Sequence, residues 1–283
     1  MNYIPSNKTT FLRWAVFCCF VAHGIVAIQS SGVYFSEWSH WVQGIFPENE
    51  KYIGSSFFLK TVGTIDIVVG ISFLNPRIYL PTFWWAIGWG ALTAFSRIYF
   101  LGSFSGFFVF NVVHPIAEFL TRMPNFMIPT VLLLFHTRGV YDVIISRVSE
   151  RRLVFVAVLA QAMAIFMAYI VDLNQPMLSY ELIKKGMPLF FLHGVGALSV
   201  AALVALVAVI GTKSVTNLRL RSGILLTSKF FFCGSYLLVE GFNVIIVNAP
   251  HGFAFTAVRI MEHVPVYLCV ALFLNVKFGN ESV

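Results

Sequence analysis

The chain has 283 residues, of which 58% are hydrophobic and only 11% are charged. Soluble domains carry about 45–50% apolar and about 25% charged residues, so this composition argues against a water-soluble globule and against an intrinsically disordered chain. The net charge of +7 comes without a nucleic-acid-binding motif or a basic stripe interleaved with aromatic residues. We therefore expect no nucleic-acid partner.

A transmembrane helix needs about 20 mostly apolar residues, and eight segments of the chain meet this requirement. The sequence therefore predicts an all-α integral membrane protein with eight transmembrane helices. The first helix follows Lys8 and Arg13, as the apolar part of a signal peptide would, but no clear cleavage site follows it, so we keep it as a helix. In chain order, the predicted helices occupy residues 11–30, 55–75, 80–101, 117–136, 152–172, 187–210, 222–247 and 254–276.

The distribution of basic residues predicts the orientation of these helices. With the N-terminus in the cytoplasm, 11 basic residues fall in the cytoplasmic loops, whereas the outer loops contain only Lys51, Lys184 and Lys185. Cytoplasmic loops are enriched in lysine and arginine, so we expect both termini in the cytoplasm and an even number of helices. A soluble partner could dock on the long outer loop 31–54.

The sequence also resembles itself at an offset of roughly 135 residues. We therefore expect two four-helix units, residues 1–140 and 150–283. Each unit holds an even number of helices, so both insert with the same orientation, as a parallel repeat about an axis along the membrane normal. The matching residues are 57–63 with 190–196, and His114, Ala117 and Arg122 with His251, Ala254 and Arg259.

Ionisable side chains inside the predicted helices are informative, because a charge at the centre of a bilayer costs about 2.5–3.5 kcal/mol even on a lenient scale. Such side chains are expected to pair and to face the interior of the bundle. Most of them fall in the outer half of their helices, and this predicts a polar pocket that opens outward. The predicted pocket residues are Lys60, Asp66, Arg97, Glu118, Arg122, His193, Glu240, Arg259 and Glu262.

Helical spacing indicates how some of these residues interact. Glu118 and Arg122 are four positions apart, and Arg259 and Glu262 are three apart, so each pair shares one face of its helix, as an ion pair would. The pairs can serve packing alone, the arginines can extend to the outer headgroups, or unpaired donors can bind a carbonyl or an anionic headgroup. A packing role and a proton-relay role are both open for Asp66, the deepest acid.

Motifs that carry chemistry are scarce. The sequence contains no GxSxG, P-loop or GxGxxG motif and no histidine–carboxylate cluster with metal-ligand spacing. His23 and His193 fall at similar predicted depth and are candidate ligands of a b-type haem, although interior packing is the simpler interpretation. We expect Trp84 and Trp85 to lie at the inner membrane interface and the four cysteines to act as small hydrophobic residues.

The first half contains two short motifs, Ala22-His23-Gly24 in the first predicted helix and Lys60-x-x-Gly63-x-x-Asp66-x-x-x-Gly70 in the second. These motifs resemble the DoxX-like family of four-helix membrane proteins, with aspartate in place of the commoner glutamate. The resemblance covers roughly residues 1–136. In the second half, the same pattern keeps Gly196 but has His193 and Ser199 at the lysine and acid positions.

The resemblance implies an association with quinone-linked redox complexes, including thiosulfate:quinone oxidoreductase. We therefore expect an accessory or structural subunit of such a membrane complex, without catalytic activity of its own, that holds a quinone or a lipid headgroup in its outward pocket. The expected partners are membrane lipids and other membrane-protein subunits, and the expected location is a bacterial cytoplasmic membrane. The alternatives are a transporter of a small solute or ion and a haem-bearing electron-transfer protein.

Overall fold

Every regular element that the structure describes is a helix, which confirms the predicted all-α class. The fifth predicted helix, residues 152–172, lies outside the described residues, to which all structural statements below are confined. The computed structural model describes residues 7–29, 42–45, 47, 49–75, 77–102, 114–137, 183–184, 186–211 and 218–274.

The helices fall within a few residues of the other predicted segments. Two of them, α1 from Thr9 to Ile28 and α3, are long and apolar enough to cross a membrane, and α9 begins with a shorter apolar stretch, Leu189–Ala202. Helix α3 begins before residue 55, so the end of the predicted outer loop 31–54 is helical. The helices are α1 (Asn7–Ile28), α3 (Lys51–Ser72), α4 (Leu80–Gly102), α5 (His114–Arg122), α6 (Pro124–Thr137), α9 (Leu189–Gly211), α10 (Leu218–Asn248) and α11 (Phe253–Leu274), with a 3₁₀ turn, η4 (Ala249–His251).

The fourth predicted helix, residues 117–136, is broken in two, which corrects the prediction of one continuous helix. Helix α5 ends at Arg122 and α6 begins at Pro124. Because proline has no N–H, Pro124 cannot donate to the carbonyl of Leu120. The N–H of Met123 donates to that carbonyl instead, at 3.4 Å, in the tighter pattern of a 3₁₀ turn. The break places Arg122 at the C-terminal end of a helix.

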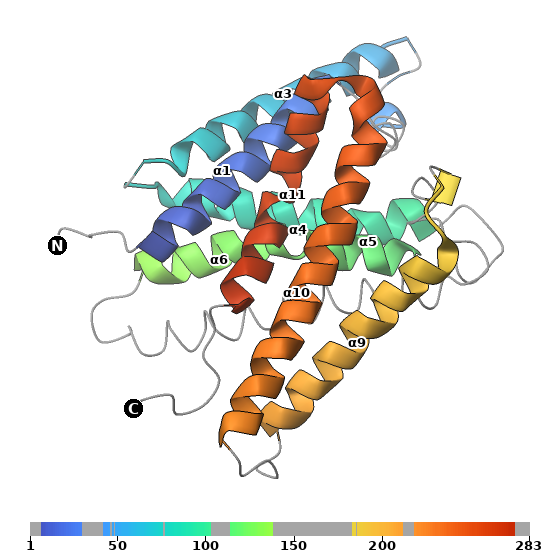
Figure 1. The fold of residues 1–283 in the computed structure, drawn as a ribbon. Coiled ribbons are helices and arrows are strands. Elements are labelled where there is room, and N and C mark those ends of the chain that lie inside the picture. Colours follow the sequence, from blue (N-terminus) through green and yellow to red (C-terminus); the bar gives the residue numbers. More distant parts are fainter. Residues whose placement is uncertain are drawn as a thin grey trace.

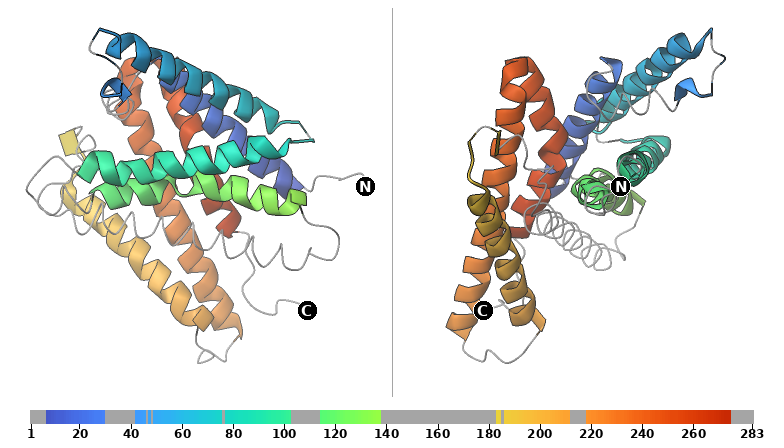
Figure 2. Two further views of the ribbon diagram at one scale, coloured as in Figure 1. Left: turned by 180° about the vertical axis from the view of Figure 1, so that it is seen from behind. Right: turned by 90° about the vertical axis from the view of Figure 1, so that its right-hand side faces the viewer.

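Helix α1 lies at the centre of the packing. It contacts α3, α6 and α11, while α4 packs along α5 and α6 (Figures 1 and 2). The apolar core at this junction includes Leu12 and Val16 of α1. Phe73, just after α3, meets Phe83 of α4 edge to face, with ring centroids 5.2 Å apart. Helix α11, the last of the described helices, therefore packs against α1, the first of them.

Helices α1 and α3 cross in close contact at two glycines. A Cβ atom on Gly63 would lie 2.6 Å from the carbonyl oxygen of Gly24, and a Cβ atom on Gly24 would collide with the carbonyl oxygen of Gly63. Two turns further along α3, a Cβ atom on Gly70 would lie 3.1 Å from the carbonyl oxygen of Phe17. Small residues let helix backbones approach, and the resulting van der Waals contact favours association where lipid is as apolar as the side chains.

Helices α9 and α10 pack against each other, and one end of this pair extends away from the crossing of α1 and α3, whereas the C-terminal end of α10 lies beside α11 (Figures 1 and 2). Helix α10 has 31 residues, which corresponds to about 46 Å at a rise of 1.5 Å per residue. Large apolar side chains lie on the outside of the pair, where Phe190 and Phe230 are 78% and 70% exposed. Helix α11 then follows η4 and packs against α10, α1 and α6, so it joins this pair to the rest of the bundle.

Candidate functional site

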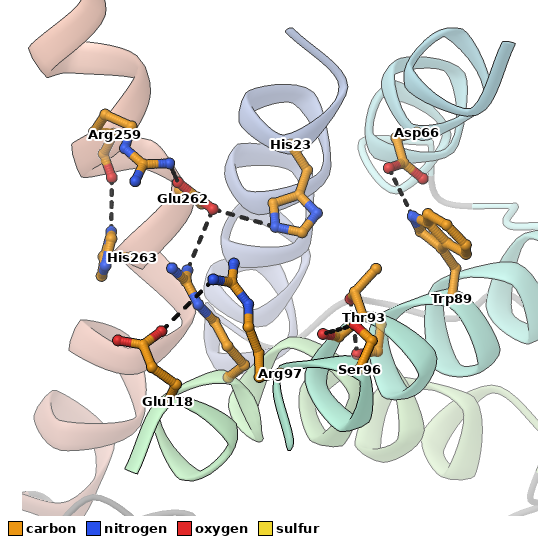
Figure 3. Close-up of polar contacts among 12 residues, drawn as sticks. His23, Asp66, Trp89, Thr93, Ser96, Arg97, Glu118, Arg259, Glu262 and His263 are labelled. Atoms are coloured by element: carbon orange, nitrogen blue, oxygen red, sulfur yellow. Dashed lines mark hydrogen bonds and ion pairs between the residues drawn. The ribbon is translucent and has the colours of Figure 1, made fainter. Parts of the chain in front are cut away.

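Glu262 of α11 is the centre of the candidate site. Its side chain is 1% exposed, and three basic side chains surround its carboxylate. Atom Oε1 lies 3.2 Å from Nε2 of His23 and 3.3 Å from Nη1 of Arg122, and Oε2 accepts a hydrogen bond from Nη1 of Arg259 at 2.5 Å (Figure 3). We call His23, Arg122, Arg259 and Glu262 the Glu262 cluster.

The Glu262 cluster connects helices that are distant in sequence. His23 comes from α1, Arg122 from the end of α5, and Arg259 and Glu262 from α11. The break before Pro124 makes Arg122 the last residue of α5, and a cation at a helix C-terminus is favoured by the helix dipole. Buried charges are costly unless they are paired, so this carboxylate ties α1, α5 and α11 to one another.

A second ion pair lies beside the Glu262 cluster. Nη1 of Arg97, from α4, is 3.7 Å from Oε2 of Glu118, from α5 (Figure 3). The sequence predicts that Glu118 pairs with Arg122 on the same face of α5. The ion pairs that the structure records for these two residues run to other helices, to Arg97 and to Glu262 respectively. The predicted spacing of Arg259 and Glu262, in contrast, corresponds to an observed ion pair.

Solvent exposure differs across the site. The side chains of Glu262 and His23 are 1% and 7% exposed, whereas those of Glu118 and Arg259 are 21% and 28% exposed. The accessible edge of the site therefore includes a guanidinium. On the neighbouring turn of α11, His263 donates from Nδ1 to the carbonyl oxygen of Arg259 at 2.8 Å, which fixes the orientation of that ring.

Asp66 of α3 occupies a separate buried position. Its side-chain oxygens accept hydrogen bonds from the indole N–H groups of Trp85, at 2.8 Å, and Trp89, at 3.0 Å. The two tryptophans are four residues apart on α4, and their rings stack with centroids 5.9 Å apart. Trp85 therefore joins α3 to α4, whereas Trp84 is exposed. That both tryptophans lie at the inner membrane interface stays a prediction.

Polar side chains follow α4 from Asp66 toward the Glu262 cluster. Trp89, Thr93, Ser96 and Arg97 recur at helical spacing, and Figure 3 shows them in a row between the two carboxylates. The hydroxyl of Thr93 donates to the carbonyl of Gly90 at 3.1 Å, and that of Ser96 donates to the carbonyl of Thr93 at 2.9 Å. Such local bonds satisfy hydroxyl donors inside a helical bundle.

The structure brings together five of the nine predicted pocket residues, namely Arg97, Glu118, Arg122, Arg259 and Glu262, and adds His23 (Figure 3). Within this group, Arg97 contacts Glu118, whereas His23, Arg122 and Arg259 contact Glu262. That they also line an outward-opening pocket stays a prediction.

Four predicted pocket residues remain, of which Asp66 occupies the separate buried position described above. Lys60 lies on the exposed side of α3, because six residues of helix turn it about 120° away from Asp66. His193 lies on α9, which packs against α10. The side chain of Glu240 in α10 lies outside the described residues.

The geometry does not support the haem expectation. The Nε2 atom of His23 faces Glu262 at 3.2 Å, while α1 packs against α3, α6 and α11 and α9 packs against α10. Among the residues that the structure describes, no group of three or more histidine, cysteine, aspartate or glutamate side chains is placed to hold a metal ion.

Comparison with known proteins gives no further guidance. No family model matches the chain, no curated protein matches it, and no solved structure matches it. A function is therefore best argued from the arrangement of the buried charges.

Proposed function

We propose that the chain crosses the membrane eight times, as two four-helix units that insert with the same orientation and leave both termini in the cytoplasm. The agreement between the predicted apolar segments and the helices supports this proposal, as do the apolar character of α1 and α3 and the large exposed side chains such as Phe57, Phe190 and Phe253. In lipid these side chains meet acyl chains instead of water.

The Glu262 cluster supports the internal repeat in a specific way. Arg122 and Arg259 are equivalent in the two proposed units, and both contact the same carboxylate. Glu262 stands three residues after Arg259, and the residue three after Arg122 is Asn125, which is buried but uncharged. The second proposed unit thus supplies the carboxylate, Glu262, that pairs with the equivalent arginines of both units.

The proposed function is that of a non-catalytic subunit of a membrane complex, linked to quinone-dependent redox proteins, that binds the polar head of a lipid-soluble ligand at the Glu262 cluster. The convergence of two repeat-equivalent arginines on Glu262 carries this proposal. Guanidinium groups donate several hydrogen bonds in a fixed geometry, which suits the carbonyl oxygens of a quinone and the oxygens of an acidic headgroup. The close glycine contact of α1 and α3 supports the proposed relation to DoxX-like proteins, because it involves the motif residues Gly24 and Gly63.

Native mass spectrometry of the full chain, purified in mild detergent, tests the proposal. The wild-type protein is expected to retain a partner subunit and a lipid-soluble ligand. Arg122→Leu and Arg259→Leu should each reduce that retention by about tenfold, the equivalent of one charge-assisted hydrogen bond. The matched control is Arg77→Leu, since Arg77 is exposed and lies in the turn between α3 and α4.

The outcome separates the proposed subunit from other classes of protein. If Arg122→Leu and Arg259→Leu both retain the partner and the ligand, the two arginines contribute to packing and not to binding. A wild-type protein that runs alone, retains no ligand and gains thermal stability with a soluble solute would contradict the subunit function.

A transporter of a proton or small polar solute is the second candidate. The row of polar side chains on α4, from Trp89 through Thr93 to Arg97, favours it, because the row connects the region of Asp66 with the Glu262 cluster (Figure 3). Purified protein in liposomes with an internal pH indicator distinguishes the two functions. Uptake that depends on Asp66 would favour the transporter.

A further inference from the structure

Helix α3 carries polar side chains on its outside, and what they bind deepens the proposed function, on which this inference rests. Lys60, Thr61 and Thr64 are exposed, and Thr64 stands four positions after Lys60 and three after Thr61, so the three share one side of the helix. We call them the α3 polar face. We propose that the α3 polar face binds a transmembrane helix of another subunit, and that Lys60 forms an ion pair there with an aspartate or glutamate of that helix.

The other side of α3 is occupied by contacts within the chain. Gly63 and Gly70 approach the backbone of α1, and Asp66 accepts hydrogen bonds from two tryptophans of α4. None of the ion pairs that the structure records for the described residues involves Lys60. Figure 2 shows α3 at the edge of the described helices. The α3 polar face therefore lies on the side of the helix that these contacts leave exposed.

The depth of Lys60 makes lipid an unfavourable neighbour for its ammonium group. Helix α3 begins at Lys51, and Lys60 lies about 14 Å along this helix, whose length is about 33 Å. The hydrocarbon core of a bilayer is about 30 Å thick, so in the proposed topology Lys60 lies near its middle. The four-carbon stem of a lysine is shorter than the distance to the membrane surface. A charge at this depth is costly unless it is paired.

The exposed side of α3 has the pattern of a helix–helix contact in a membrane. Apolar side chains stand before and after the α3 polar face, where Phe57 and Val68 are 71% and 58% exposed. Polar side chains in the middle of such a face hydrogen-bond across to a neighbouring helix. The hydroxyl of Thr64 donates to the carbonyl of Lys60 at 2.7 Å, and its oxygen can still accept a hydrogen bond.

Charge complementarity favours a different subunit over the other occupants. In a dimer with a two-fold axis along the membrane normal, an interface through α3 would set the Lys60 side chains of both copies at the same depth, where like charges repel strongly. Asp66, the acidic residue of α3, is bonded to Trp85 and Trp89. The headgroup of a lipid lies at the membrane surface, far from Lys60. A carboxylate on a transmembrane helix of another protein meets the requirement.

The first part of the test locates the neighbour of α3 in native membranes. A photoreactive phenylalanine analogue replaces Thr64 in the full chain, and the matched control carries it in place of Phe230, which is exposed on α10. Position 64 should cross-link to a transmembrane segment of another subunit that contains an aspartate or glutamate, and position 230 should not reach that segment. Cross-links from position 64 to lipid alone, or to a second copy of this chain, overturn the inference.

The second part tests the charge of Lys60 by native mass spectrometry. Lys60→Leu should lower retention of the partner about tenfold, the equivalent of one charge-assisted hydrogen bond, whereas Lys60→Arg and the exposed control Arg77→Leu should retain it. The isolated Lys60→Leu chain should be at least as heat-stable as the wild type, because leucine suits lipid better than lysine. Lys60→Glu should lose the partner, and a lysine in place of the cross-linked acid of the partner should restore it.

Each result decides the inference and separates it from the proposed function. Lys60→Leu that retains the partner as the wild type does overturns the ion pair, and so does a charge exchange that restores nothing, even if Lys60→Leu fails to fold. In both cases a partner held by the wild type leaves the proposed function standing. A wild-type protein that retains no partner contradicts both.

Discussion

Two buried carboxylates of this protein are satisfied in opposite ways. Asp66 accepts hydrogen bonds from two neutral indoles on the adjacent helix α4. Glu262 contacts two guanidinium groups and an imidazole from three helices. Neutral donors stabilise Asp66 within one proposed unit and leave no positive charge there. The cations around Glu262 come from helices that are distant in sequence, so a carboxylate stabilises a local contact in one place and joins distant parts of the chain in the other.

The largest effect is expected when the charge of Glu262 is removed. Glu262→Gln keeps the shape of the side chain but leaves Arg122 and Arg259 without their shared carboxylate. Breaking a buried ion pair by removing one partner costs about 3–5 kcal/mol. Unfolding of the protein in mixed micelles, followed by circular dichroism, should show this loss of stability.

The control for Glu262 is Glu118→Gln. The Glu118 side chain is 21% exposed and its pair with Arg97 spans 3.7 Å, so we expect a loss below about 1 kcal/mol. Equal losses in the two variants would contradict the view that Glu262 is the central acid of the site.

The glycine contact between α1 and α3 should give the next largest effect. In Gly63→Ala, the new methyl group meets the carbonyl oxygen of Gly24 at 2.6 Å, and the helices must separate. Overpacking of this kind costs about 1–3 kcal/mol, measured by the same unfolding assay.

Gly88→Ala is the matched substitution on α4, where a Cβ atom would have no neighbour within 4 Å. Alanine favours helix by up to about 1 kcal/mol over glycine, so this variant should be as stable as the wild type or slightly more stable. A destabilised Gly88→Ala together with a tolerated Gly63→Ala would show that backbone approach does not hold α1 against α3.

An effect smaller than that of Glu262→Gln is expected for Asp66→Asn. The amide keeps one oxygen acceptor, but its NH₂ group faces an indole N–H, so one hydrogen bond is lost at a cost of about 1–3 kcal/mol. Tryptophan fluorescence should change, because Trp85 and Trp89 both bond to this side chain. Trp84→Phe, at an exposed position, is the fluorescence control. A loss for Asp66→Asn as large as that for Glu262→Gln would remove the distinction between the two carboxylates.

The sequence predicts most of the described helices but not their contacts. Long apolar segments predict helices well, because an apolar environment leaves the backbone few other ways to satisfy its hydrogen bonds. The ion pair of Arg259 and Glu262 follows from their spacing within one helix. The partners of Glu118 and Arg122 do not, since a shared helix face does not specify which neighbouring helix it meets.

Two features of the site can be predicted from the sequence: the end of a helix at Arg122, and the shared helix face of Trp85 and Trp89. Pro124 indicates a helix boundary, and it ends α5 at Arg122. Trp85 and Trp89 are four residues apart and therefore share one face of α4, and a buried indole N–H seeks an acceptor. Their acceptor, Asp66, lies on another helix, so only the three-dimensional structure identifies the pair.

The sequence separation within the Glu262 cluster has a consequence for synthesis. Arg122 and Glu262 are 140 residues apart, so at typical translation rates of about 5–20 residues per second the arginine is made roughly 7–28 s before its carboxylate. During that interval the nascent chain already contains Glu118, one helical turn before Arg122 and able to neutralise it. Synthesis of α11 then allows Arg122 to exchange Glu118 for Glu262, and a chain truncated before α11 lacks the carboxylate that Arg122 contacts in the folded protein.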